Sequence, residues 1–157
     1  MSDIHLMLDD TDKKILRILA DDGRINNLAL AEAINLSPTP CARRVKRLEE
    51  AGIIEGYRAI VNRRALGYSL SAFIAVTLDH HTPERFTAFE GQVSGFPEVI
   101  RMSIVTGRAE DYLLQVLVGN MQEFEEFLLG KLNRFPGVIN VHSSFEMRCV
   151  FERQPQP

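Results

Sequence analysis

The sequence predicts an α+β protein of two domains: a winged helix-turn-helix domain over residues 1–61 and a ferredoxin-like βαββαβ domain over residues 62–157. Residues 27–47 have the pattern of two short helices joined by a tight turn, and the second helix is rich in Arg and Lys. From Tyr68 onward, strand-like and helix-like segments alternate in the order β-α-β-β-α-β. A chain of 157 residues can bury one core or two small ones.

The first helix is predicted to begin at the acidic residues Asp9, Asp10 and Asp12. Acidic side chains at a helix start accept hydrogen bonds from free backbone N–H groups and complement the helix dipole. The turn Asp22-Gly23 is expected to end this helix. Its apolar positions are Ile15, Leu16, Ile18 and Leu19.

Two caps define the predicted helix-turn-helix. Asn27 is expected to be the N-cap of the second helix, and Asn35 interrupts the apolar pattern of that helix. Leu36 is expected to fill the turn. Ser37 is the predicted N-cap of the third helix, with Pro38 at its first position, where no N–H is needed.

The third helix carries four basic residues in five positions: Arg43, Arg44, Lys46 and Arg47. No acidic residue lies between Glu32 and Glu49. A solvated helix face is the ordinary explanation for basic residues on a helix. Their density on the second helix of a tight pair favours instead a surface that contacts DNA phosphates and base edges.

The net charge of −3 conceals an asymmetry between the two parts of the chain. Through Arg64 there are eleven Lys and Arg against ten Asp and Glu, a charge of +1; from Ala65 onward there are seven against eleven, a charge of −4. The acids of the first part gather near its start, so we expect the basic residues 43–47 to be unopposed. These acids are Asp9, Asp10, Asp12, Asp21 and Asp22.

The remaining composition favours a soluble cytoplasmic protein. No apolar run approaches the ~20 residues of a membrane span, and the N-terminus lacks the pattern of a signal peptide. Cys41 and Cys149 are far apart and have no metal or redox spacing, so we expect reduced thiols and no metal site.

The third helix is predicted to end at Gly52. Residues 53–61 then change to a strand-like pattern with a kink at Gly56, which we interpret as a short β-ribbon and linker that forms a winged extension of the first domain. The boundary between the domains is expected near residues 62–67.

Four strands and two helices are predicted in the second domain. The strands cover residues 68–79, 98–106, 111–118 and 139–152. The helices are expected to be capped by Thr82 and Asn120 and to be stopped at Gly95-Phe96-Pro97 and Phe135-Pro136-Gly137. Their apolar stripes are Phe86, Phe89 and Val93 in the first, and Phe124, Phe127, Leu128 and Leu132 in the second.

Two helices can cover only one face of a four-stranded sheet. The other face is expected to carry Phe73, Met102, Ile104 and alternate members of the last strand. An uncovered apolar face is normally an interface, so we predict a homodimer formed through this domain.

Several motifs resemble those of the Lrp/AsnC family, the leucine-responsive or feast/famine regulators. The most specific is Leu36-Ser37-Pro38-Thr39-Pro40-Cys41 inside a helix-turn-helix. The resemblance covers nearly the whole chain. Its other motifs are the Leu8, Asp9 and Asp12 pattern, Asp22-Gly23-Arg24-Ile25, residues 44–49, residues 52–57, Thr106-Gly107, Asp111-Tyr112-Leu113-Leu114 and Phe135-Pro136-Gly137-Val138.

The resemblance implies a transcriptional regulator that binds double-stranded DNA and responds to a small effector, typically a free amino acid bound between dimers. Dimers of the family often assemble into octamers. No catalytic residue or cofactor is implied. The matching DNA-binding residues are Ser37, Thr39, Arg43, Arg44, Lys46 and Arg47 on a recognition helix from Ser37 to Leu48. The matching effector residues are Thr106, Gly107, Arg108, Asp111 and Tyr112.

This chain departs from the family pattern in the effector loop. Three residues, Arg108, Ala109 and Glu110, separate Gly107 from Asp111, where the family usually has two. Without the resemblance, Asp111 would be interpreted as a turn or capping residue and Tyr112 as a core residue of a strand.

Two other functions are compatible with this architecture. Sirohaem decarboxylases resemble the same family and depend on basic and His residues in the second domain, but the intact basic cluster at residues 43–47 speaks against an enzyme. A ligand-sensing protein that does not bind DNA is disfavoured for the same reason. We therefore expect a regulator and no enzyme.

Overall fold

The computed structural model describes residues 7–107 and 109–151. The chain divides into two compact units, one ending at Ile60 and the other spanning Val61–Val150. Each unit has its own hydrophobic core and is described by itself.

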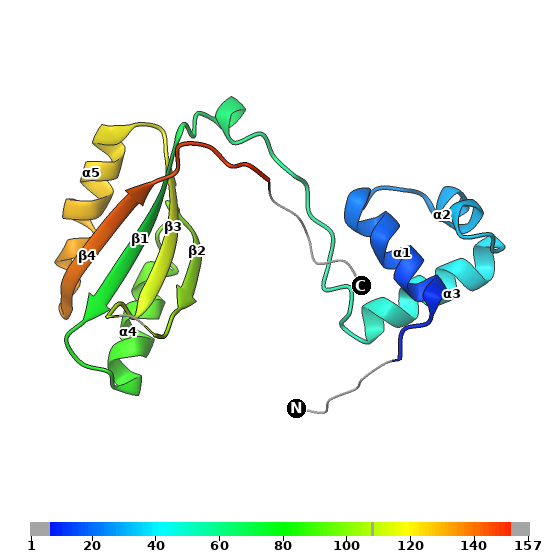
Figure 1. Cartoon of the computed structure of the whole chain (residues 1–157), viewed down its shortest axis with the longest axis horizontal. Helices are drawn as coiled ribbons and strands as arrows, with labels where there is room; N and C mark the ends of the chain where they lie inside the picture. Colours follow the sequence, from blue (N-terminus) through cyan, green and yellow to red (C-terminus); the bar gives the residue numbers. More distant parts are fainter. Residues whose placement is uncertain (1–6, 108, 152–157) are drawn as a thin grey trace. The chain divides into compact units, whose positions relative to one another are not determined.

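The N-terminal unit contains three helices: α1 (Asp10–Asp21), α2 (Asn27–Ala33) and α3 (Pro38–Glu50) (Figure 1). The helix-turn-helix prediction is confirmed by α2 and α3. The core between the helices is made of Ile15, Leu30, Ala31, Ile34, Cys41 and Leu48.

The caps at the helix starts agree with the prediction in two cases out of three. Asp9 caps α1, and its carboxylate accepts a hydrogen bond from the Asp12 backbone N–H at 2.8 Å. Ser37 occupies the N-cap position of α3, although its hydroxyl makes no capping bond. The predicted Asn27 cap is wrong by one residue, because Asn26 accepts the Ala29 N–H at 2.9 Å. The Asn27 side chain instead donates to the Pro38 carbonyl.

The turn between α2 and α3 depends on one residue in the left-handed conformation. Asn35 has φ +56°, and the following Leu36 N–H donates to the Ala31 carbonyl at 2.9 Å. Leu36 then packs against the core, as predicted. Gly52 (φ +68°) ends α3 in the same way, with the Ile53 N–H donating to the Leu48 carbonyl.

The strand predicted over residues 53–61 is wrong. Residues 51–69 contain no strand and only a short 3₁₀ turn at Arg64–Leu66. A strand needs a neighbour to receive its hydrogen bonds, and no described segment pairs with residues 53–61. An alternating pattern of residue types does not show whether a neighbouring strand is present.

The C-terminal unit is an antiparallel four-stranded sheet with two helices, which confirms the βαββαβ prediction. Its strands are arranged in the order β2-β3-β1-β4. Along the chain the elements are β1 (Leu70–Leu78), α4 (Pro83–Val93), β2 (Val99–Ile104), β3 (Tyr112–Val118), α5 (Met121–Gly130), a 3₁₀ turn at Leu132–Arg134, and β4 (Val138–Phe145).

The core of this unit lies between the two helices and one face of the sheet (Figure 1). The helices contribute Phe89 and Val93 from α4, and Phe124 and Phe127 from α5. The sheet contributes alternate residues of its two central strands: Ala72, Ile74, Val76 and Leu78 from β1, and Tyr112, Leu114, Val116 and Val118 from β3.

The opposite face, which we call the open face, differs from the prediction. Phe73 lies there and is 37% exposed. Met102 and Ile104 do not, because they pair directly with Leu114 and Tyr112 and therefore share the helix-covered face. The open face is Ser71, Phe73, Ala75, Thr77, Arg101, Ser103, Leu113, Gln115, Leu117, Asn140, His142 and Ser144.

The open face is thus more polar than expected, and the last strand is shorter. β4 stops at Phe145, which pairs with Ala72, because β1 begins only two residues earlier at Leu70. The predicted continuation of the strand to residue 152 is therefore wrong over residues 146–151; the last residue lies outside the described part of the chain.

No helix in the described part of the chain is long and apolar enough to cross a membrane. Cys41 is buried in the N-terminal core and Cys149 is exposed, and both are free thiols. Burial raises the pKa of the Cys41 thiol, which keeps it in the unreactive protonated form.

The difference between buried and exposed leucines in this unit predicts that the same substitution changes the free energy of unfolding by unequal amounts. Leu114→Ala should lower the free energy of unfolding by about 2–5 kcal/mol, because the side chain is fully buried and its removal leaves a cavity. Leu129→Ala, on the exposed side of α5, is the matched control and should cost less than ~1 kcal/mol. Urea denaturation of the two variants measures both values, and equal costs would contradict this core assignment.

Candidate DNA interface and effector site

The exposed face of α3 carries a small set of polar and basic side chains. Thr39, Arg43 and Lys46 are spaced four and three residues apart, which places them on one side of the helix. All three are exposed. Lys46 lies 3.6 Å from Glu50, but both side chains are about two-thirds exposed, so this ion pair is weak. Arg43 makes no ion pair with any described residue.

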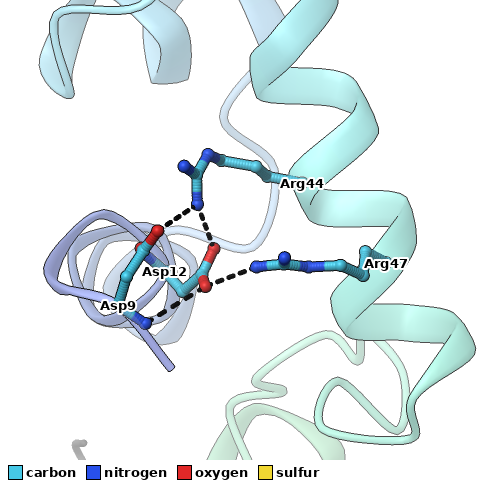
Figure 2. Close-up of polar contacts among 4 residues, drawn as sticks. All are labelled: Asp9, Asp12, Arg44 and Arg47. Carbon is cyan, nitrogen blue, oxygen red and sulfur yellow. Dashed lines mark hydrogen bonds and ion pairs between the residues drawn. The ribbon is translucent and has the colours of Figure 1, made fainter. Parts of the chain in front are cut away.

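The other two arginines of α3 face α1 (Figure 2). One Arg44 nitrogen lies 2.7 Å from an Asp9 oxygen and 2.8 Å from an Asp12 oxygen. An Arg47 nitrogen lies 2.5 Å from the other Asp12 oxygen. We call these four residues the Asp–Arg cluster.

Asp12 is the centre of the Asp–Arg cluster. Its side chain is fully buried, whereas those of Arg44 and Arg47 remain 29% and 47% exposed. The Asp9 backbone N–H also donates to Asp12, at 3.3 Å, so both carboxylate oxygens have partners. Breaking a buried ion pair leaves an uncompensated charge and typically costs about 3–5 kcal/mol. The cluster therefore joins the start of α1 to the middle of α3.

The expectation that the basic residues 43–47 would be unopposed is wrong for Arg44 and Arg47, and Lys46 has a weak partner in Glu50. The acidic residues at the start of α1 were interpreted only as a helix cap. They are separated from the arginines by 32 and 35 residues, so no local sequence pattern connects them. Arg43 and Lys46 remain the basic side chains of the predicted set that point away from this cluster.

The contacts within the Asp–Arg cluster shift the pKa values of Asp9 and Arg44. The pKa of Asp9 is lowered below its ordinary 3.8, first by the hydrogen bond from the Asp12 backbone N–H and then by the Arg44 guanidinium. Hydrogen bonds to the same two carboxylates raise the pKa of Arg44.

The candidate effector loop connects β2 to β3 in the second unit. The Val105 N–H donates to the Asp111 carbonyl at 2.9 Å and closes the loop. Thr106 is exposed, and Gly107 has φ +91°, a conformation that other residues adopt only with strain. Arg108 lies outside the described residues.

Asp111 is held by two neighbours at the edge of this loop. One of its oxygens accepts the Leu78 N–H at 2.7 Å, and the other lies 2.9 Å from the His81 ring. These partners lie 33 and 30 residues away in the chain, so Asp111 does not cap its own turn; it joins the loop to the end of β1. The His81 side chain is itself 64% exposed, and its pairing with Asp111 spans 30 residues, so no local sequence pattern indicates the contact.

Tyr112 is separated from the other loop residues because its ring is fully buried. It packs between Phe86 and Phe89, and its hydroxyl donates to Glu90 at 2.8 Å. Burial and the Glu90 carboxylate raise the pKa of Tyr112. The structure thus places this predicted effector residue in the core, while Thr106, Gly107 and Asp111 lie on one loop.

A cavity of about 300 Å³ lies at the other end of the sheet. It is lined by the end of β3, at Leu117 and Val118, and by the Glu98–Lys131 ion pair. None of the described loop residues, 105–107 and 109–111, lines it. The loop and this cavity are therefore separate features of the unit.

Two family models match the sequence in the same order as the two units. Residues 8–55 match a model described as winged helix-turn-helix DNA-binding. Residues 71–156 match a model described as the Lrp/AsnC ligand binding domain.

Similar proteins match over nearly their whole lengths. A leucine-responsive regulatory protein of Rhizobium meliloti is 42% identical over 147 residues, which is 94% of this chain and 94% of the relative. The Bkd operon transcriptional regulator of Pseudomonas aeruginosa is 39% identical over 150 residues, covering 96% of this chain and 97% of that one.

A solved structure supports the same fold. A transcriptional regulator of Neisseria meningitidis in complex with L-Met aligns with a TM-score of 0.90 and 37% identity, over 96% of each chain.

The lowered pKa of Asp9 predicts a pH-dependent contribution to stability. Because its folded-state pKa lies below its unfolded value, the contribution is complete above about pH 4 and is lost as the pH falls through the lowered pKa. The stability difference between wild type and Asp9→Asn should therefore be largest near neutral pH and should vanish in acid.

Urea denaturation followed by circular dichroism at several pH values measures this difference. Asp10→Asn is the matched control, since Asp10 is exposed on the same turn and makes no ion pair with a described residue. A difference for Asp9→Asn that does not change with pH would contradict the assignment.

Proposed function

This chain belongs to the Lrp/AsnC family and is a DNA-binding transcriptional regulator with a ligand-binding C-terminal domain; we propose which of its residues contact DNA and which contact the effector. The proposal rests mainly on one observation: α3 presents Thr39, Arg43 and Lys46 on an exposed face, opposite its buried residues Cys41 and Leu48.

The proposed DNA interface begins at the start of α3. In a helix-turn-helix, the first residues of the second helix enter the major groove. We assign base or sugar contacts to the exposed hydroxyls of Ser37 and Thr39, and phosphate or base contacts to Arg43 and Lys46. The domain boundary near residue 61 separates this interface from the effector domain.

We propose that the chain acts as a homodimer that assembles further, as the family resemblance implies. On the open face, Phe73 and Leu113 are more than one-third exposed, and a second copy would cover them. Further apolar residues of the same unit are exposed: Val61, Leu66, Met147 and Val150. A two-fold dimer would present two recognition helices to the two halves of an operator.

The proposed effector is a free amino acid bound at the loop of residues 105–111. The Neisseria meningitidis regulator binds L-Met, and its fold is that of this chain. In the proposed site, the ligand ammonium replaces the exposed His81 ring beside Asp111, and Gly107 lets the backbone approach the ligand. A second subunit completes the site, and ligand binding shifts the equilibrium between assemblies.

We propose no enzymatic activity. A sirohaem-decarboxylase-like enzyme would need histidines of the second domain to contact a bound tetrapyrrole. In this chain the His81 ring lies against Asp111 and the His142 ring against Asn140. The relatives are transcriptional regulators. Absence of colour after incubation with a tetrapyrrole, under conditions in which DNA is bound, would support this reading. As a regulator of transcription, the chain is proposed to act in the cytoplasm.

The DNA assignment predicts a specific effect of Arg43→Gln. Each DNA phosphate that a basic side chain neutralises releases counterions on binding. Loss of the Arg43 contact should therefore reduce the magnitude of the slope of the logarithm of the binding constant against the logarithm of the salt concentration by about 0.9 per bound helix. Binding should weaken on all sequences if Arg43 contacts phosphate. Fluorescence anisotropy over a range of salt concentrations measures the slope. Arg134→Gln, the same change in the other unit, should leave it unaltered.

The effector assignment predicts that Asp111→Asn removes the amino-acid response. Asparagine keeps a carbonyl for the Leu78 N–H but loses the charge that would pair with an ammonium. Wild type should gain thermal stability with one or a few of the twenty amino acids, and the variant should not.

Light scattering in the same samples reports assembly. Dimer formation and DNA binding should be unchanged in Asp111→Asn, and Glu110→Ala, the neighbouring loss of charge, should keep the response. An unchanged ligand response in Asp111→Asn would refute the site.

A further inference from the structure

Asp12 is a charged side chain that is completely buried within the N-terminal unit. It lies in the first turn of α1, outside the helix-turn-helix itself, and engages two arginines of α3 (Figure 2). Burial of a carboxylate is unfavourable unless it is paired and hydrogen-bonded. This carboxylate therefore needs a structural or functional reason to be there.

The two arginines are three residues apart, so they project from neighbouring turns of α3 on nearly the same side. A single carboxylate that binds both, one through each oxygen, resists rotation of α3 about its own axis as well as its sliding along α1. A contact with only one arginine would restrict the rotation less.

Rotation of α3 decides which side chains meet DNA. Arg43 and Arg44 are consecutive and therefore point about 100° apart around the helix. With Arg44 and Arg47 held against α1, the side of α3 that carries Thr39, Arg43 and Lys46 is left exposed. A rotation of one residue would exchange Arg43 for Arg44.

We propose that Asp12 is a positioning residue for DNA recognition. It holds α3 in the rotation that presents Thr39, Arg43 and Lys46, and it withdraws Arg44 and Arg47 from phosphate contact by neutralising them within the protein. This inference rests on the proposed DNA interface. It changes the roles of two of the four basic residues that the sequence assigned to DNA.

A direct phosphate contact by Arg47 is the competing explanation. Its side chain is 47% exposed, and a guanidinium has five N–H donors, of which the structure assigns one to Asp12. The two explanations differ in the number of counterions that Arg47 releases on binding. Salt dependence therefore separates them.

The test uses the full-length chain and two duplexes of equal length. One is selected from random DNA by the wild-type protein, and the other is unrelated in sequence. Binding constants of wild type, Arg43→Gln, Arg47→Gln and Asp12→Asn are measured on both duplexes over a range of salt concentrations. Circular dichroism and thermal unfolding establish that each variant is folded at the assay temperature.

Arg43→Gln, which removes a proposed contact, should lower the salt slope by about 0.9 per bound helix, whereas Arg47→Gln should leave it nearly unchanged. Asp12→Asn should free the Arg47 guanidinium and leave Arg44 paired with Asp9 alone, so its slope on the unrelated duplex should become steeper. Its preference for the selected duplex should fall about tenfold, a loss comparable to one mismatched base pair.

Two results would overturn the inference. A fall in slope for Arg47→Gln equal to that for Arg43→Gln would make Arg47 a phosphate contact. An unchanged sequence preference in folded Asp12→Asn would remove its positioning role. If Asp12→Asn does not fold, Arg47→Gln replaces it, since this half-exposed residue provides one of the two bonds from Asp12 to α3: its preference for the selected duplex should fall at an unchanged slope, and an unchanged preference would overturn the inference. If the wild-type protein selects no sequence from random DNA, the proposed DNA interface is wrong, and the positioning role of Asp12 is then wrong as well.

Discussion

The buried carboxylate of Asp12 is the contact on which the geometry of the DNA-binding unit depends. It joins α1 to α3 through Arg44 and Arg47, while the apolar core beneath, including Ile15 and Leu48, supplies most of the burial. Apolar contacts are non-directional and tolerate rotation of a helix, whereas paired hydrogen bonds to one carboxylate do not. The core therefore stabilises the helix-turn-helix, and the Asp–Arg cluster determines which side of α3 is exposed to DNA.

The second unit is governed by a simple geometric limit. Two helices cover one face of its four strands, and we propose that a second copy of the chain covers the other face. The open face combines Phe73 and Leu113 with polar residues such as Gln115 and His142. A mixed surface of this kind suits a subunit contact that must be specific in register. The candidate effector loop joins the end of β2 to the start of β3, so a shift of the proposed sheet contact would reach it.

The sequence predicts the five α-helices of the described chain and the βαββαβ order, because caps such as Asp9, Thr82 and Asn120 and the apolar stripes are local signals. It does not predict that the last helix ends at Gly130, so that Leu132 lies in a separate 3₁₀ turn. It was insufficient wherever the answer depended on contacts between distant residues. The face of Met102 depends on its register with Leu114, the role of Arg47 on Asp12, and the setting of Asp111 on His81. The strand expected over residues 53–61 failed for the same reason, since pairing cannot be seen in a single segment.

We propose that the arginines of α3 are divided between the protein and DNA: Arg44 and Arg47 bind carboxylates of α1, and Arg43 binds DNA. Nuclear magnetic resonance of ¹⁵N-labelled arginine side chains in the full chain, free and bound to its selected duplex, distinguishes the two groups. The side-chain signal of Arg43 should shift on binding, while those of Arg44 and Arg47 should keep their positions and their slow exchange with water. Large shifts of Arg44 and Arg47 with an unmoved Arg43 would contradict this division.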